Sequence, residues 1–225
     1  IVLDAAIATR LRRAGEEGIG GLRVGVLRDP GRTLPGPDAE MAAALEDGIG
    51  VLAKLGARVV DARLPWPAST CLDAARVIGA VESASIHEVE FRQSAHLMGA
   101  ALRDKILAGL SVSAVDYLAA QRFRRAFTDA MDAVWVDHDV LLAFGTLHQP
   151  PRLGMEPESG AYTMETMLTP ASLAGLPAMV QCTGFSGGGL PLNWQLLTRR
   201  GGEAAMFRLA IAYERATPWR SRRPL

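Results

Sequence analysis

Cysteine is scarce in this sequence. Its 225 residues contain only Cys71 and Cys182, which lie far apart and have no CxxC or histidine spacing nearby. This pattern argues against a zinc site and gives no disulfide framework. We therefore expect a cytoplasmic protein that needs no metal and no other cofactor.

Net charge and long apolar runs are also missing. Lysine and arginine number 24, as do aspartate and glutamate, so no long-range positive field is available to hold a polyanion. No apolar run approaches the roughly 20 residues that a membrane span needs. No leader of basic, apolar and small residues opens the chain. We expect no nucleic-acid partner, no membrane span and no secretion.

Lysine is rare as well, since Lys54 and Lys105 are the only two. Each stands where a solvated ammonium group is expected rather than a base. The chain is 49% hydrophobic and 21% charged, which suits one sizeable core but leaves two small domains open. It begins with Ile1 rather than methionine, and we expect residues 1–20 to be a linker or a remnant helix of a longer protein.

Hydrophobic patterning predicts an α/β fold. Residues 22–27 and 57–61 are short β-branched runs bounded by turn residues, and each predicts a strand. Between them, apolar residues recur at three- and four-residue spacing from Pro37–Asp38 to Leu55, which predicts a helix. A strand, helix, strand unit of this kind is normally parallel.

The rest of the chain also shows patterns of helices and strands. Alanine-rich residues 71–98 predict one long helical stretch, and Ser113 is placed to cap a second long helix whose inward stripe includes Phe127 and Met131. Further patterns predict a strand at 139–144, a long loop at 145–160, a short helix at 163–175, strands at 177–182 and 190–197, and a helix at 203–216.

Reactive side chains do not assemble into a reaction centre in the sequence. Ser186 lies in GFSGG rather than GxSxG and precedes a strand, so it indicates a hairpin turn and not a nucleophile elbow. Cys182 has no cationic neighbour, His87 is typical of a solvated surface residue, and His138 is typical of a helix cap. His148, in the long loop, is harder to dismiss, but the sequence nominates no partner for it.

The string TPASLAGLPAMVQCTGFSGGGLPLNWQLL at 169–197, followed by AYE at 212–214, resembles the C-terminal part of the amidase signature family. The resemblance implies an α/β fold with a mixed sheet wrapped by helices. It also implies that residues 1–225 are the C-terminal portion of a single amidase domain, and that the glycine-rich run is a hairpin turn.

Members of this family hydrolyse carboxamide C–N bonds with a serine nucleophile, a bridging serine in a cis peptide and a lysine base. Those residues lie N-terminal to the matched region, this sequence has no adjacent pair of serines, and Lys54 does not match the lysine's place. The resemblance therefore implies an amidase whose catalytic residues are upstream of this chain, with none in it. It also implies a partner, either an N-terminal amidase segment or a separate chain, and a small-molecule amide substrate.

What this chain would supply is a wall of the substrate pocket. The candidates stand at a predicted strand end and before the GLPA motif, and ordinary packing or helix capping is an equal alternative for them: Phe144, Thr146, Thr169, Ser172 and Leu173. Ser172, Gln181 and Asn193 depart from the residues common in the family, which leaves the specificity open.

Two other functions stay open at this point. The chain could be a non-catalytic α/β module for ligand binding or assembly, or it could be an A-type subunit of an amidotransferase. The sequence also leaves a homodimer open as a further partner.

Overall fold

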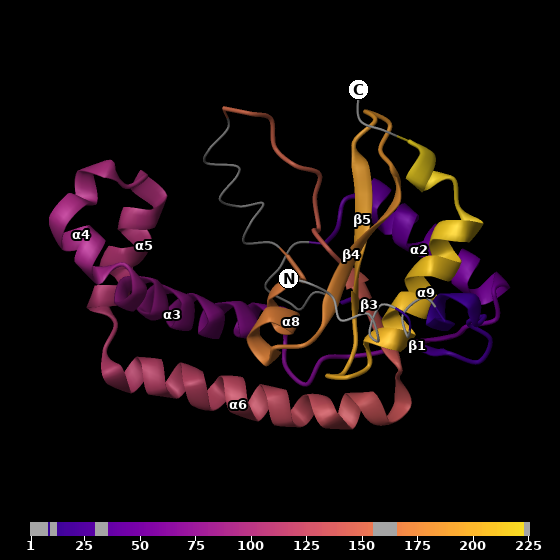
Figure 1. The fold of residues 1–225 in the computed structure, drawn as a ribbon, viewed down its shortest axis with the longest axis horizontal. Coiled ribbons are helices and arrows are strands. Elements are labelled where there is room, and N and C mark those ends of the chain that lie inside the picture. The colour runs from indigo at the N-terminus through magenta and orange to yellow at the C-terminus, as the bar shows by residue number, and fades with distance from the viewer. Residues whose placement is uncertain (1–8, 10–12, 30–35, 155–165, 223–225) are drawn as a thin grey trace.

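A computed structural model describes residues 9, 13–29, 36–154 and 166–222. Its centre is a five-stranded mixed sheet with strand order β2-β1-β3-β5-β4 (Figure 1). The strands are β1 (Arg23–Leu27), β2 (Arg58–Asp61), β3 (Val140–Phe144), β4 (Ala178–Phe185) and β5 (Pro191–Leu197). The predicted α/β class with a mixed sheet is confirmed.

The parallel half of the sheet contains the predicted strand, helix, strand unit. β1 pairs in parallel with β2 on one side and with β3 on the other. Helix α2 (Ala39–Lys54) connects β1 to β2. β3 is buried along its whole length, as expected for a central strand of continuous apolar residues.

The antiparallel half is the β4–β5 hairpin, with a bulge between Cys182 and Gly184. Its turn is closed by Ser186, whose N–H donates to the Leu190 carbonyl at 2.8 Å and whose hydroxyl accepts from the Leu190 N–H at 3.1 Å. Gly189 has φ +82°, a conformation that glycine adopts at no steric cost. The hairpin-turn interpretation of the serine and glycine run is confirmed.

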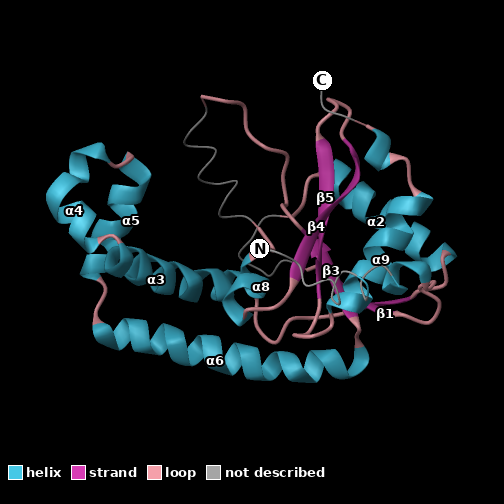
Figure 2. Cartoon of the chain, in the orientation of Figure 1, coloured by secondary structure: helices cyan, strands magenta, loops and turns pink. Residues whose placement is uncertain are grey.

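Helices cover both faces of the sheet (Figure 2). On one face, α2 and α9 (Glu203–Ala216) contact each other, and the buried Trp194 of β5 packs against Tyr213 of α9. Adjacent residues of a strand point to opposite faces of the sheet, so Gln195, next to Trp194, points to the other face. There its side chain donates to the Met167 carbonyl, just before α8 (Thr169–Ala174). α9 has the predicted bounds, and its buried face consists of Met206, Leu209, Ala210 and Tyr213.

A helical arm extends from the α8 side, away from the sheet (Figure 1). Its helices are α3 (Ala68–Ile86), α4 (Glu88–Ser94), the 3-10 turn η1 (Ala95–Leu97) and α5 (Ala100–Ser111), and α6 (Ala114–Asp137) runs back to the sheet. The expected single helical stretch at 71–98 was wrong, because the chain breaks at His87 (φ −104°, ψ 14°). α5 was not predicted.

The structure tests the predicted cap of α6 and part of the helix expected at the start of the chain. Ser113 accepts a hydrogen bond from the Asp116 N–H at 3.1 Å, which confirms the predicted cap of α6. Of the expected remnant helix at 1–20, residues 9 and 13–16 are helical, and Arg215 of α9 donates to the Gly15 carbonyl at 2.8 Å. Residues 1–8 and 10–12 of this expected helix lie outside the described residues. So do residues 163–165 of the helix expected at 163–175 and residues 155–160 of the loop expected at 145–160. A short 3-10 turn, η2 (Trp219–Ser221), follows α9.

Candidate functional site

The candidate site lies where β3 ends and the chain returns toward α8. The Thr166 hydroxyl donates to the Gly145 carbonyl at 2.8 Å and accepts from the Leu168 N–H at 3.2 Å. The Gln195 side chain of β5 donates to the Met167 carbonyl at 3.1 Å. These bonds fasten the entrance of α8 to the ends of β3 and β5.

The structure places all five predicted wall residues at the end of β3 or in α8. Thr146 forms an antiparallel bridge with Thr166 directly after β3, and Thr169 is the first residue of α8; both are half-buried. Phe144 and Leu173 are 3% and 5% exposed and belong to the main hydrophobic core. Ser172, also in α8, is exposed. Their role as a substrate wall stays a prediction.

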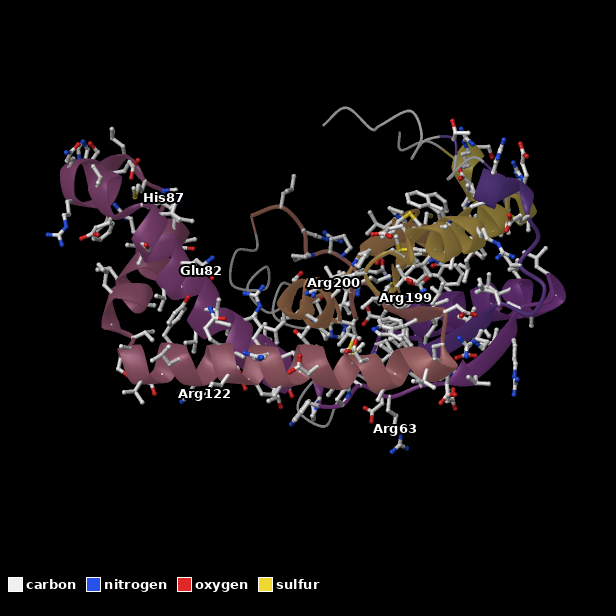
Figure 3. All side chains as sticks on the ribbon, turned by 60° about the horizontal axis from the view of Figure 1, so that its bottom comes forward. Arg63, Glu82, His87, Arg122, Arg199 and Arg200 are labelled. Carbon is white, nitrogen blue, oxygen red and sulfur yellow. The ribbon has the colours of Figure 1, made fainter. Side chains whose placement is uncertain are left out.

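The position of α8 is set by arginines from elsewhere in the chain. Arg124 of α6 donates to the Leu173 carbonyl at 2.9 Å. Arg200 donates to the Ala174 carbonyl at 2.6 Å and to the Gly175 carbonyl at 3.1 Å, which satisfies carbonyls that a helix end leaves open. Gly175 ends the helix with φ 63°, the left-handed conformation common after helices. Figure 3 shows Arg200 next to α8, with Arg199 beside it.

A histidine and an aspartate meet beside the site, and sequence reasoning missed the pair. Nδ1 of His148 lies 2.9 Å from Oδ1 of Asp38, and the Gln149 N–H donates to Oδ2 of Asp38 at 3.0 Å. Burial raises the pKa of Asp38, but these hydrogen bonds outweigh it, and the net pKa is below the usual value. The two residues are 110 positions apart, and Asp38 resembles an ordinary helix start in the sequence.

Glu40 extends this contact to the hairpin. Its Oε2 accepts from the Gln149 side chain at 2.5 Å, and its Oε1 accepts from the Gly187 N–H at 2.6 Å. We call Asp38, Glu40, His148, Gln149 and Gly187 the carboxylate clamp. The clamp joins the start of α2, the loop after β3 and the turn between β4 and β5.

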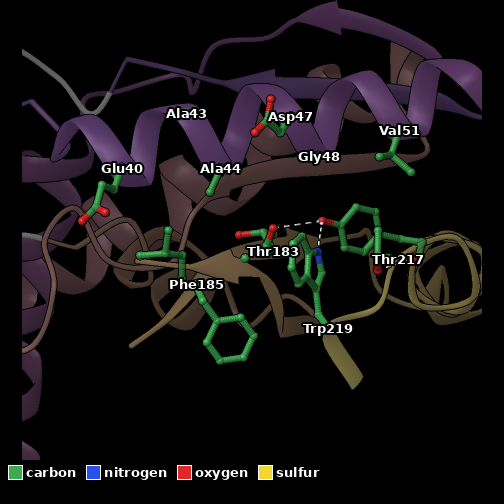
Figure 4. Close-up of a pocket in the computed structure, with 13 residues that line it drawn as sticks. Glu40, Ala43, Ala44, Asp47, Gly48, Val51, Thr183, Phe185, Thr217 and Trp219 are labelled. Atoms are coloured by element: carbon green, nitrogen blue, oxygen red, sulfur yellow. Dashed lines mark hydrogen bonds between the residues drawn. The ribbon is translucent and has the colours of Figure 1, made fainter. Parts of the chain in front are cut away.

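A pocket of about 250 Å³ lies next to the clamp, between α2, β4 and the end of α9 (Figure 4). Glu40 and Asp47 line one side of it, and Trp219 lines the other. The Tyr213 hydroxyl donates to the Thr183 carbonyl at 3.3 Å and accepts from Nε1 of Trp219 at 3.2 Å. Burial raises the pKa of this tyrosine, so its hydroxyl stays protonated at neutral pH.

Two of the reactive groups singled out in the sequence, Ser186 and His138, have structural partners. Ser186 closes the hairpin turn, and Nδ1 of His138 lies 2.8 Å from the Val134 carbonyl at the end of α6. Burial raises the pKa of Cys71 to about 12, which keeps its thiol protonated. Within the described ranges, no cluster of three or more histidine, cysteine, aspartate or glutamate side chains could hold a metal ion. No helix in those ranges is long and apolar enough to span a bilayer.

The fold is shared with enzymes of known structure. A bacterial aryl acylamidase of the amidase signature family superposes with a TM-score of 0.80 at 21% identity, over 96% of this chain and 49% of that one. A 6-aminohexanoate cyclic dimer hydrolase complexed with substrate superposes with a TM-score of 0.79 at 25% identity, over 95% of this chain and 49% of that one.

Sequence comparison shows the family. The Amidase family model matches residues 5–207, and the chain therefore belongs to the amidase signature family. One curated relative is the A-type subunit of the glutamyl-tRNA(Gln) amidotransferase of Myxococcus xanthus, which is 31% identical over 89% of this chain and 46% of that protein. The chain thus spans about half the length of the curated relatives it matches.

Proposed function

We propose that these 225 residues are the C-terminal part of an amidase that hydrolyses carboxamide C–N bonds. In this proposal a serine nucleophile, a bridging serine and a lysine base lie on polypeptide that precedes this chain, either joined to it or as a separate chain. The region at the end of β3 and the start of α8 supplies a wall against which a small amide substrate is held.

One combination of observations carries the proposal. The family match extends over residues 5–207, yet no two serines are adjacent anywhere in the sequence. The reaction needs an activated serine and hydrogen-bond donors for the oxyanion, and the serine of the glycine-rich run is committed to a hairpin turn. In this proposal the residues that face the substrate belong to this chain, and the residues that break the C–N bond belong to the polypeptide that precedes it.

The anchored entrance of α8 supports the wall assignment. A substrate wall works by holding the amide in one orientation, which requires rigid backbone behind it. The bonds from Thr166 and Gln195 fix that backbone against the sheet. Thr146, Thr169 and Ser172 are the polar candidates that remain at least partly accessible.

A serine-reactive fluorophosphonate probe tests the proposal. The complete protein, meaning this chain together with the polypeptide that precedes it, is treated with the probe and the modified peptide is identified by mass spectrometry. We expect the modified serine to lie outside residues 1–225. Modification of Ser186 or of any other serine of this chain, with matching loss of activity, would overturn the proposal.

The curated relatives favour a second candidate, the A-type subunit of an amidotransferase. That function would need glutamine as the nitrogen donor and a second polypeptide. An assay of ammonia release separates the two: an amidase that is complete with its catalytic segment releases ammonia from carboxamides by itself, whereas an amidotransferase component depends on an additional partner polypeptide.

A further inference from the structure

Another pocket lies at the other end of β3 from the candidate site. It has a volume of about 490 Å³ and is formed where β1 and β3 begin, where β5 ends and along one side of α6. Its apolar lining consists of Met131, Trp135 and Val136 of α6 and of Leu176, which follows α8. Met131 and Trp135 are buried, so they form a floor that suits an apolar group.

The rest of the lining is polar, and positive charge is in excess there. Three arginines and two aspartates leave a net charge of plus one with histidine neutral: Arg23, Arg199, Arg200, Asp132 and Asp139. Thr128 and His138 complete the lining, and each donates to a carbonyl of α6. The pocket therefore attracts an anion.

The three arginines differ in what they already bind. Nη2 of Arg23 lies 2.8 Å from Oδ1 of Asp139, and its Nη1 donates to the Val136 carbonyl at 2.6 Å. Arg200 donates to two carbonyls at the end of α8. The guanidinium of Arg199 is exposed and has no hydrogen bond or ion pair with the residues that the structure describes. Arg199 is thus the arginine with donors left for a ligand.

The charges of the pocket select the class of anion. A guanidinium group matches both carboxylate and phosphate. The hydrogen bond from Arg23 holds the pKa of Asp139 below its usual value, so Asp139 is ionised at neutral pH and opposes negative charge. One carboxylate neutralises the net charge of plus one, whereas a doubly charged phosphate would leave an excess of negative charge. The apolar floor then favours a carboxylate that carries an apolar group.

We propose that this pocket binds a small organic carboxylate, with its charge on the Arg199 guanidinium and its apolar body against Trp135 and Leu176. This site goes beyond the proposed function and does not depend on it. Arg200 lines the pocket and also holds the end of α8. A bound carboxylate would therefore lie beside an arginine that positions α8.

Two arginine variants give a matched test with benzoate as the probe. Isothermal titration calorimetry of the complete protein at neutral pH measures its dissociation constant, which we expect to be about 1 mM or lower. Arg199→Gln should weaken benzoate binding by about tenfold, because a charge-assisted hydrogen bond is lost. Arg122→Gln removes the same charge from an exposed position of α6 away from the pocket and should leave binding unchanged (Figure 3).

Asp132→Asn gives a test in the opposite direction. It removes a negative charge from the lining, so we expect benzoate to bind about threefold more tightly. Inorganic phosphate and benzyl alcohol are comparison ligands, since the first has no apolar body and the second has no charge. We expect each to bind at least about tenfold more weakly than benzoate. Circular dichroism and thermal unfolding check that the variants fold.

The contrary outcomes are distinct from one another. Benzoate that does not bind, or whose affinity changes in neither Arg199→Gln nor Asp132→Asn, would overturn the proposal. Phosphate that binds as tightly as benzoate would assign the pocket to inorganic anions, and benzyl alcohol that does so would assign it to neutral ligands; either result overturns the proposal as well. None of these results concerns the position of the catalytic serine, so the proposed function is tested separately.

Discussion

The contact between α2 and the sheet gives a stability prediction with a built-in control. Gly48 of α2 faces the ring of Trp194, and a Cβ atom at position 48 would lie 2.5 Å from Cζ3 of that ring. Trp194 is fully buried, its ring centroid lies 4.4 Å from that of Tyr213, and its Nε1 donates to the Gln181 side chain at 3.2 Å. The ring therefore has little room to move when a methyl group is added.

The magnitude follows from two opposing effects. Replacing a glycine by alanine inside a helix gains about 1 kcal/mol of helix propensity. Forcing one extra methyl group into a packed core costs about 1–3 kcal/mol. Gly48→Ala should therefore lower the free energy of unfolding by up to about 2 kcal/mol.

Gly50 lies in the same helix and has no atom within 4 Å of a built Cβ, so Gly50→Ala keeps only the gain in propensity. We expect Gly50→Ala to raise the free energy of unfolding by up to about 1 kcal/mol. Urea unfolding followed by circular dichroism measures both variants. A Gly48→Ala protein as stable as Gly50→Ala would refute the close packing of α2 on Trp194.

Two further predictions concern titratable groups. Asp38→Asn should lower stability at neutral pH by about 1 kcal/mol, because the Asp38 carboxylate accepts bonds from His148 and Gln149. The folded-state pKa of Asp38 is lowered, so the stability that its carboxylate contributes is present above the ordinary value of 3.8 and is lost as the pH falls through the folded-state pKa. A stability difference between variant and wild type that widened as the pH falls below 3.8 would contradict this. At pH 8 a thiol reagent should modify Cys182 and spare Cys71, because burial raises the pKa of the Cys71 thiol to about 12. Both cysteines should react once urea unfolds the chain. Modification of Cys71 in the folded chain would contradict its burial.

The sequence predicted the elements whose pattern is local. The bounds of α9 and the β4–β5 hairpin followed from apolar spacing and turn chemistry alone. The break at His87 was missed because no proline or glycine marks it, and the alanine-rich pattern continues on both sides.

The carboxylate clamp could not be predicted in this way. Asp38 and His148 meet only because the loop after β3 returns to the start of α2, and neither residue has a neighbour in the sequence that signals the pairing. The wall candidates illustrate the same limit: residue type and position in a motif indicated them, but which side chains stay accessible depended on the packing of α8. Phe144 and Leu173 were thus found in the core, and Ser172 at the surface.

Amide turnover by the isolated chain is the most direct test of the central claim that the bond-breaking groups lie on other polypeptide. The purified 225-residue chain is incubated with a panel of aliphatic and aryl carboxamides, and ammonia or amine release is measured against the complete protein. We predict no release above the buffer rate for the isolated chain and clear release for the complete protein. Turnover by the isolated chain, retained through repeated purification, would contradict the claim.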